Sequence, residues 1–200
     1  MCYRLFRALY LTILKLFFGF RVEGKENIPQ YGGFILAANH VSYIDPAALG
    51  CACPRILSFV ARDTLFKVPI LGLWMRCVGC IPVKRKSADL GALRESMQKV
   101  KSGGVLGLFP EGTRQTGGIS DKAEAGVGFL ASKCKAPVIP ALILGTDKVL
   151  PRGAKFLRPG KIKVIFGEPI EINSGLSYEL IATSIMQDIR KIYEKQQNLR

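Results

Sequence analysis

The chain contains a single histidine, His40, and an aspartate five positions later, Asp45, just after the apolar residues 34–38. Asp45 precedes Pro46, and an aspartate before a proline is typical of a helix start. A strand, a short loop and a helix start can fold the carboxylate back onto the imidazole. One ring nitrogen would then donate to Asp45, while the other takes a proton from a hydroxyl. A simple helix cap beside an ordinary loop histidine fits the same pattern, and both interpretations stay open at this point.

A second group of polar side chains follows the apolar residues 105–109, in the order Glu111, Gly112, Thr113 and Arg114. Glycine and threonine favour a sharp turn, which would present Glu111 and Arg114 at the end of a strand. A guanidinium in that place can bind a phosphate through two parallel hydrogen bonds, and the glutamate can orient it or bind a hydroxyl. The alternative is an exposed ion pair worth about 0.2–1 kcal/mol.

Cations gather at two further places. Residues 79–83 have the composition of a short strand and lead into Lys84, Arg85 and Lys86, while Lys67 lies in the hydrophobic stretch LFKVPILG. Such clusters are usually solvated faces, so their position near turns suggests phosphate binding without establishing it.

The size and charge of the chain limit what it can be. Two hundred residues, 48% of them hydrophobic, suffice for one well-cored domain and little more. The 29 Lys and Arg against 15 Asp and Glu leave a net charge of +14, which favours a polyanionic partner. Charge alone does not decide between nucleic acid and anionic lipid.

The six cysteines lie in apolar surroundings and predict reduced, buried thiols in a chain that faces the cytosol. Cys77 and Cys80 form a CxxC pair, but no second pair accompanies it and His40 is the only histidine. Zinc binding is therefore a weak hypothesis, and no metal is expected.

Residues 1–21 combine dense apolar residues with basic ones, and Lys15 divides the apolar run. Each part is shorter than the roughly 20 apolar residues that a membrane-spanning helix needs. We therefore expect a helix that lies in the membrane interface, followed by a linker over residues 22–33. A secretory signal peptide fits less well because no small-residue cleavage site follows Phe20. A first core helix of a soluble domain is the other interpretation.

The rest of the chain alternates between strand and helix patterns, which predicts a single α/β domain over residues 34–200. Its sheet should be mixed and largely parallel, with helices flanking it. The expected strands are 34–38, 56–60, 105–109, 138–144 and 162–166, and the expected helices are 70–77, 88–101, 123–134 and 177–196. Gly103 and Gly104 favour a left-handed turn at the end of the second of these helices.

Four motifs in this order, NHVSYID, GCIPVKR, FPEGTR and VIPALIL, resemble the motif blocks of the 1-acyl-sn-glycerol-3-phosphate acyltransferases, within the wider glycerolipid acyltransferase group. The resemblance runs from about residue 22 to residue 167. The chain has none of the additional hydrophobic spans of many eukaryotic members, so it is similar to the compact bacterial type.

The resemblance implies a role for each matching residue. His40 would be the general base and Asp45 its orienting partner. Arg85, Glu111 and Arg114 would bind the glycerol phosphate, with Gly112 and Thr113 shaping the turn, Lys67 as a further phosphate ligand and residues 138–144 supporting the acyl pocket. Backbone N–H groups near His40 would be the natural donors to the oxyanion of the tetrahedral intermediate.

The implied reaction moves a fatty acyl group from acyl-CoA or acyl carrier protein to lysophosphatidic acid. The product is phosphatidic acid, an intermediate of phospholipid biosynthesis. Neither cofactor nor metal is implied, and the expected location is an anionic lipid surface at the cytoplasmic face of the inner cell membrane. Other acceptors, such as another lysophospholipid, an aminolipid or glycerol 3-phosphate, remain alternatives.

Two non-enzymatic functions are less consistent with the sequence. A silent lipid-binding protein has no chemical reason to keep His40, Asp45, Glu111 and Arg114 together. A nucleic-acid partner is not expected, because the basic residues do not alternate with exposed aromatics and no recognised nucleic-acid motif occurs.

Overall fold

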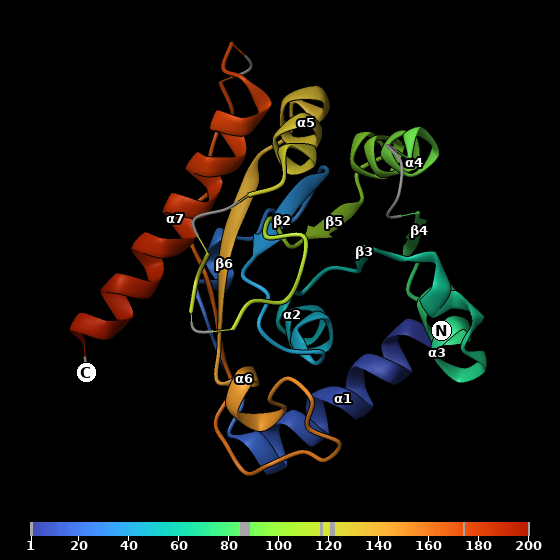
Figure 1. Cartoon of the computed structure of the whole chain (residues 1–200), viewed down its shortest axis with the longest axis vertical. Coiled ribbons are helices and arrows are strands. Elements are labelled where there is room, and N and C mark those ends of the chain that lie inside the picture. Colours follow the sequence, from blue (N-terminus) through green and yellow to red (C-terminus); the bar gives the residue numbers. More distant parts are fainter. Residues whose placement is uncertain (1, 85–88, 117, 121–122, 174, 200) are drawn as a thin grey trace.

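A seven-stranded sheet forms the centre of the computed structural model, which describes residues 2–84, 89–116, 118–120, 123–173 and 175–199 (Figure 1). In sheet order the strands are β1 (Arg21–Glu23), β7 (Lys163–Phe166), β6 (Val138–Leu144), β2 (Phe34–Ala38), β5 (Val105–Leu108), β3 (Leu57–Arg62) and β4 (Ile81–Val83). Neighbouring strands are parallel, except for the antiparallel pair β6 and β7. The mixed, largely parallel sheet expected from the sequence is confirmed.

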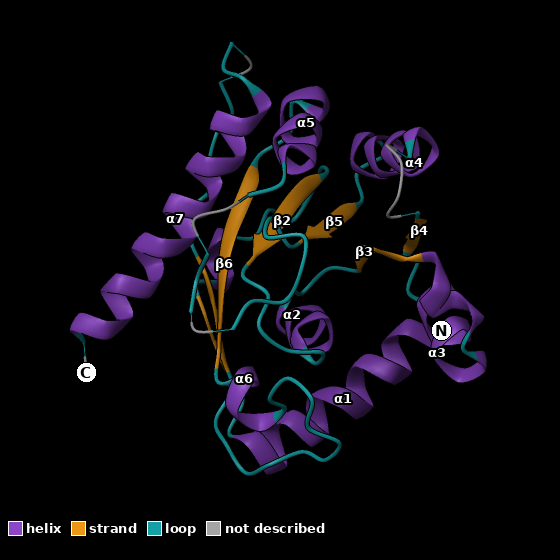
Figure 2. Ribbon diagram, in the orientation of Figure 1, coloured by secondary structure: helices purple, strands orange, loops and turns teal. Residues whose placement is uncertain are grey.

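Helices cover both faces of this sheet because β2 is apolar on both sides (Figure 2). Phe34, Leu36 and Ala38 belong to one core cluster, while Ile35 and Ala37 belong to the other. The first cluster is covered by α1 (Cys2–Phe18), α2 (Asp45–Ala52) and α3 (Pro69–Cys77). The second is covered by α4 (Leu90–Lys101), α5 (Ala125–Cys134) and α7 (Tyr178–Asn198), and the short α6 (Thr146–Val149) follows β6.

The expected helices all occur, with ends within two residues of the predicted ones. Local signals explain this agreement. Asp89 and Ser177 each accept a hydrogen bond from a backbone N–H of the helix that follows, α4 and α7 respectively. Gly103 has a φ of 86°, so the left-handed turn after α4 is also confirmed.

Residues 22–33, expected to be a linker, are in part an element of the domain. β1 extends the sheet by pairing with β7, and a 3-10 helix (Lys25–Asn27) follows it. Gly24 joins the two with a φ of 71°, and a Cβ there would lie 2.0 Å from the Phe166 carbonyl oxygen. A strand of three residues is too short to show an alternating pattern, and its partner lies far along the chain, so sequence reasoning missed it.

The N-terminal helix α1 is docked on the domain. Leu14 and Phe18 are buried in the core, and Arg7 donates to the carbonyl oxygens of Gly50 (3.3 Å) and Cys51 (3.1 Å) at the end of α2. These carbonyls have no partner within their own helix, so the guanidinium satisfies them. Within the part of the chain that the structure describes, no helix has both the length and the apolar character required to cross a membrane.

Contact between α5 and α7 yields a test of the packing. A Cβ on Gly128 would lie 1.9 Å from the Tyr178 carbonyl oxygen, whereas one on Gly126, in the first turn of α5, meets nothing within 4 Å. We expect Gly128→Ala to lower the free energy of unfolding by about 1–3 kcal/mol because the helices must separate. Gly126→Ala is the matched control and should be neutral or stabilising by up to about 1 kcal/mol. Chemical unfolding of both variants checks this, and equal stabilities would contradict it.

Candidate active site

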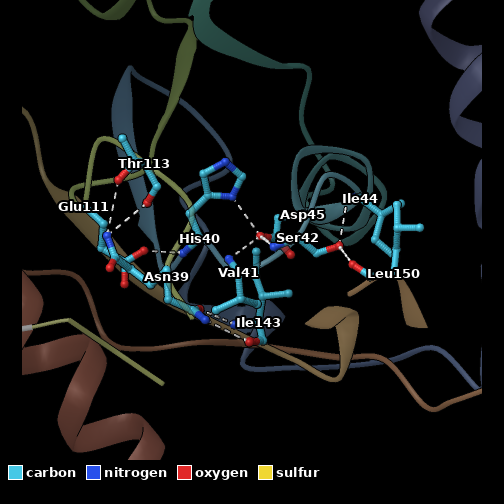
Figure 3. Close-up of polar contacts among 11 residues, drawn as sticks. Asn39, His40, Val41, Ser42, Ile44, Asp45, Glu111, Thr113, Ile143 and Leu150 are labelled. Atoms are coloured by element: carbon cyan, nitrogen blue, oxygen red, sulfur yellow. Dashed lines mark hydrogen bonds and ion pairs between the residues drawn. The ribbon is translucent and has the colours of Figure 1, made fainter. Parts of the chain in front are cut away.

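The loop between β2 and α2 brings His40 and Asp45 into contact (Figure 3). The imidazole Nδ1 lies 2.8 Å from Asp45 Oδ2, and the aspartate is fully buried. Although α2 begins at Asp45, the carboxylate does not cap that helix but turns back onto the loop. The same oxygen accepts hydrogen bonds from the backbone N–H groups of Val41 and Ser42, each at 2.7 Å. Because an ionised carboxylate only accepts, this contact places the imidazole proton on Nδ1 and leaves the Nε2 lone pair free.

Glu111 holds the backbone of His40 from the other side. Its Oε2 accepts the His40 N–H at 2.6 Å and its Oε1 accepts the Ser120 N–H at 3.3 Å. The Gln115 N–H donates to the His40 carbonyl oxygen at 2.8 Å, so both backbone groups of His40 are bound by the segment after β5. The sequence suggested that Glu111 orients Arg114 or binds a hydroxyl. The structure instead gives its buried carboxylate two backbone partners.

Burial also changes the acidity of this side chain. Removal from water raises the pKa of Glu111 from near 4.5 to about 7, and the negative charge of Asp45 adds to the rise. The two N–H donors act in the opposite direction because they stabilise the carboxylate. Near neutral pH the Glu111 carboxyl group is therefore close to its own pKa.

An aromatic stack fixes the plane of the imidazole. Phe109 packs on the His40 ring with centroids 4.1 Å apart and an interplanar angle of 20°. The other partner of Phe109 is Phe59 of β3, at 5.8 Å and 6°. Sequence reasoning placed Phe109 only at the end of an apolar strand, because a contact between three separate segments leaves no local pattern.

Asn39 and Ser42 secure the two ends of the histidine loop. The Asn39 side chain donates to the Ile143 carbonyl oxygen (3.0 Å) and accepts the Ile143 N–H (2.7 Å). The Asn39 side chain thus makes the two bonds to β6 that the backbone of a strand residue would make, at the point where the chain leaves the sheet. The Ser42 hydroxyl donates to the Leu150 carbonyl oxygen at 2.9 Å. Neither residue was singled out from the sequence.

Arg114 lies beside the same loop. Its guanidinium carbon is 3.3 Å from the centroid of the Tyr43 ring, a cation–π contact between the turn after β5 and the histidine loop. Gly112 has a φ of 65° and Thr113 is exposed beside it, in agreement with the expected turn. The structure therefore brings His40, Asp45 and Arg114 to one edge of the sheet.

Of the two remaining expected phosphate ligands, Lys67 and Arg85, the structure describes only Lys67. Lys67 is exposed at the end of a 3-10 helix (Asp63–Lys67), and the described contacts do not link it to His40 or Arg114. Arg85 lies outside the described residues. Lys84, the residue before it, is exposed, and its N–H donates to Asp89 Oδ2 at 3.1 Å.

Three of the backbone N–H groups near His40 are already engaged. The backbone N–H of His40 binds Glu111, and those of Val41 and Ser42 bind Asp45. These three groups can bind a developing oxyanion only if the loop changes its hydrogen bonds. In the CxxC pair Cys80 is buried and Cys77 is exposed, and the described residues contain no group of three or more His, Cys, Asp or Glu able to hold a metal ion.

A narrow apolar cavity lies next to the aromatic stack. Its walls come from α1, α2, α3 and β3, and include Tyr3, Tyr10, Ala47, Phe59 and Trp74. Phe59 belongs both to this wall and to the stack on His40. The cavity is thereby connected to the imidazole through two aromatic rings. Strand β6, expected to support such a pocket, contributes to the site through Ile143 and does not line this cavity.

Comparisons with known proteins agree with the geometry. Residues 19–144 match the family model described as Acyltransferase. The chain is 31% identical over 160 residues to a 1-acyl-sn-glycerol-3-phosphate acyltransferase of Bacillus subtilis, covering 80% of this chain and 77% of that protein. A chloroplastic relative from Brassica napus with the same description is 31% identical over 153 residues, 74% of this chain and 44% of its own length. The crystal structure of the 1-acyl-sn-glycerophosphate acyltransferase from Thermotoga maritima superposes with a TM-score of 0.77 at 28% identity, covering 97% of this chain and 79% of that one.

The raised pKa of Glu111 predicts that the stability of the fold depends on pH. Since folding raises the pKa of Glu111 from near 4.5 to about 7, its contribution to stability is complete below about pH 4.5 and is lost as the pH rises through 7. Glu111→Gln cannot ionise. We therefore expect the wild-type chain to lose on the order of 1–3 kcal/mol relative to this variant between about pH 5 and pH 8. Denaturant titrations across this range measure the difference, and a difference that is constant with pH would disprove the assignment.

Proposed function

The chain belongs to the 1-acyl-sn-glycerol-3-phosphate acyltransferase family, and from this membership we propose that it transfers a fatty acyl group from an acyl thioester to the free hydroxyl of 1-acyl-sn-glycerol 3-phosphate. Phosphatidic acid is the product, and the reaction serves phospholipid biosynthesis. The observation that carries the proposal is the His40–Asp45 pair, which leaves Nε2 free to accept a proton and whose loop carries Tyr43, the ring that Arg114 contacts.

The proposed reaction is a direct transfer. His40 Nε2 takes the proton of the lysolipid hydroxyl while its oxygen attacks the thioester carbonyl carbon. The tetrahedral intermediate collapses, the carbon–sulfur bond breaks, and the imidazolium returns the proton to the departing thiolate. Asp45 stabilises the imidazolium from 2.8 Å, and the Phe109 ring keeps it in one orientation. The chain needs no covalent nucleophile for this sequence of steps.

Arg114 is the best supported ligand for the phosphate of the acceptor. The Tyr43 ring covers one face of its guanidinium, which leaves the N–H edges available for two parallel hydrogen bonds to phosphate oxygens. Glu111, Gly112 and Thr113 would act mainly by shaping and holding this turn. Arg85 and Lys67 remain proposed as further phosphate ligands.

We propose that the acyl chain occupies the apolar cavity between α1 and α2, whose volume of about 30 Å³ must widen to admit the chain. Its walls are almost entirely hydrocarbon or aromatic, and it approaches the His40 ring through Phe59. Either acyl-CoA or acyl carrier protein can supply the thioester. No further cofactor is proposed.

We also propose that α1 lies in the interface of an anionic membrane at the cytoplasmic face of the cell membrane. Leu5, Leu9 and Leu16 are exposed on one side of the helix, at 73%, 55% and 73%. Burial of such residues at the acyl–headgroup boundary is favourable, and the net charge of +14 adds attraction to anionic lipid.

His40→Ala tests the activity directly. We expect the rate of acyl transfer to lysophosphatidic acid to fall by about 10²–10⁴-fold, because no other group replaces the base. Purified protein is assayed with both donors and with lysophosphatidic acid, a second lysophospholipid and glycerol 3-phosphate, and mass spectrometry identifies the products. Unchanged vesicle binding is the control for folding. Wild-type turnover in His40→Ala would end the mechanism, and a preference for another acceptor would replace the proposed substrate.

Tyr43 and Arg114 can be tested as a pair. We expect Arg114→Ala to raise the KM for the acceptor by about 10–100-fold, since a charge-assisted contact to phosphate is lost. Tyr43→Ala should raise it by about 2–5-fold, whereas Tyr43→Phe keeps the ring and should behave as wild type. The double variant Tyr43→Ala/Arg114→Ala should resemble Arg114→Ala alone. An unchanged acceptor KM in Arg114→Ala would remove Arg114 from the phosphate site.

A further inference from the structure

The loop of residues 151–161, which joins α6 to β7, has a composition that the proposed reaction does not use. Phe156 and Leu157 at its tip are 81% and 52% exposed. The loop also carries four exposed cations, Arg152, Lys155, Arg158 and Lys161, and no acidic residue occurs between positions 148 and 161. An exposed Phe–Leu pair within a ring of cations is costly in water and is suited to a surface that is both apolar and anionic.

This loop has a defined structure. The Ala154 N–H donates to the Pro151 carbonyl oxygen (3.0 Å), and the Arg158 N–H donates to the Val149 carbonyl oxygen (2.8 Å). At its far end the Ile162 N–H donates to the Phe18 carbonyl oxygen of α1, at 2.9 Å. The loop is therefore held between α6 and the last turn of α1, and Phe156 and Leu157 are presented by a fixed backbone.

The loop and α1 lie at the same end of the molecule, below the sheet in Figure 1. At 100° per residue, Leu5, Leu9 and Leu16 fall within about 40° of one another around α1. Leu14 and Phe18 lie roughly opposite and are buried in the core, so the leucine stripe points away from the domain. A further exposed apolar residue lies on α3, where Ile70 is 85% exposed, and Trp74 of the same helix packs near Tyr10 of α1 at 6.2 Å.

We infer that residues 151–161 form a second membrane contact, in which Phe156 and Leu157 enter the acyl–headgroup boundary of an anionic bilayer and the surrounding cations bind lipid phosphates. The inference rests on the proposed attachment of α1 to the membrane, because the end of the loop is bonded to the last turn of α1. It does not depend on which lysolipid is acylated.

A bilayer fits this surface better than an acidic protein does. The cations alone would suit either partner, but α1 and α3 also carry exposed leucine and isoleucine side chains, so exposed apolar residues are not confined to the loop. An extended apolar area with cations is the arrangement that interfacial membrane proteins use.

Contact between lipid and residues 151–161 would also position the histidine loop between β2 and α2. The residue before the loop, Leu150, accepts the hydrogen bond from the Ser42 hydroxyl, and the Ser42 N–H binds Asp45. One short chain of bonds thus connects the lipid-contacting loop to the partner of His40. Anchoring residues 151–161 would hold His40 at a fixed height relative to the headgroups that carry its substrates.

Vesicle partitioning of the full chain tests the inference. Sedimentation with phosphatidylcholine vesicles, with and without phosphatidylglycerol, is measured for Phe156→Ser/Leu157→Ser and for Lys155→Glu/Arg158→Glu. We expect the first variant to bind both kinds of vesicle about tenfold more weakly and the second to lose about tenfold on anionic vesicles only. The matched controls are Leu90→Ser/Leu180→Ser, at residues 61% and 57% exposed, and Lys101→Glu/Lys133→Glu, which changes the net charge equally. Both controls should bind more tightly than the corresponding loop variants.

A fluorescent probe reports the contact independently. Phe156→Trp in a Trp74→Phe background leaves a single tryptophan at the loop tip, because Trp74 is the only one in the chain. Lipids brominated on their acyl chains should quench it. If the wild-type chain binds neither kind of vesicle, both this inference and the attachment of α1 fail. If it binds but the loop variants match their controls and the probe is not quenched, this inference alone is wrong. Loop variants that keep vesicle binding but lose binding to an acidic acyl carrier protein would also overturn it.

Discussion

A single oxygen atom, Oδ2 of Asp45, holds together the histidine loop between β2 and α2. It accepts three hydrogen bonds, from the His40 imidazole and from the backbone N–H groups of Val41 and Ser42. Since the carboxylate is fully buried and its other oxygen, Oδ1, has no partner among the described residues, these bonds are stronger than they would be in water and the loss of one would be costly. The interaction that sets the state of the base therefore also sets the path of the backbone around it. If the loop took another path, the His40 imidazole would lose the carboxylate that orients it.

The parallel pairing of β2 and β5 explains why the two reactive motifs meet. Ala37 pairs with Leu108, so both strands end at the same edge and the chain leaves them side by side. Glu111 then binds the His40 N–H across this edge, while Phe109 covers the imidazole. The buried Glu111 carboxyl group costs free energy to ionise, as its raised pKa shows. Its hydrogen bond to His40 keeps the loop that carries Arg114 in position relative to the base.

Helix α1 belongs to the core on one side and is exposed and apolar on the other. This explains why its apolar residues almost encircle the helix, a pattern that fits neither a surface helix nor a membrane span. Arg7 is one of the basic residues of this helix, but its guanidinium binds the end of α2. Part of the positive charge counted from the sequence is thus bound within the fold and does not face lipid.

The α/β order, most element ends, the turn at Gly112 and the choice of His40, Asp45 and Arg114 as chemical candidates could be predicted from the sequence. These features depend on periodicity, capping residues and motif spacing, which are local in the chain. The fold was needed to show that Glu111 binds backbone N–H groups, that Phe109 stacks on the base with Phe59 behind it, that Tyr43 contacts Arg114, and that residues 21–23 extend the sheet. Each of these is a contact between segments distant in sequence, and its geometry comes from strand pairing and burial, which no local pattern records.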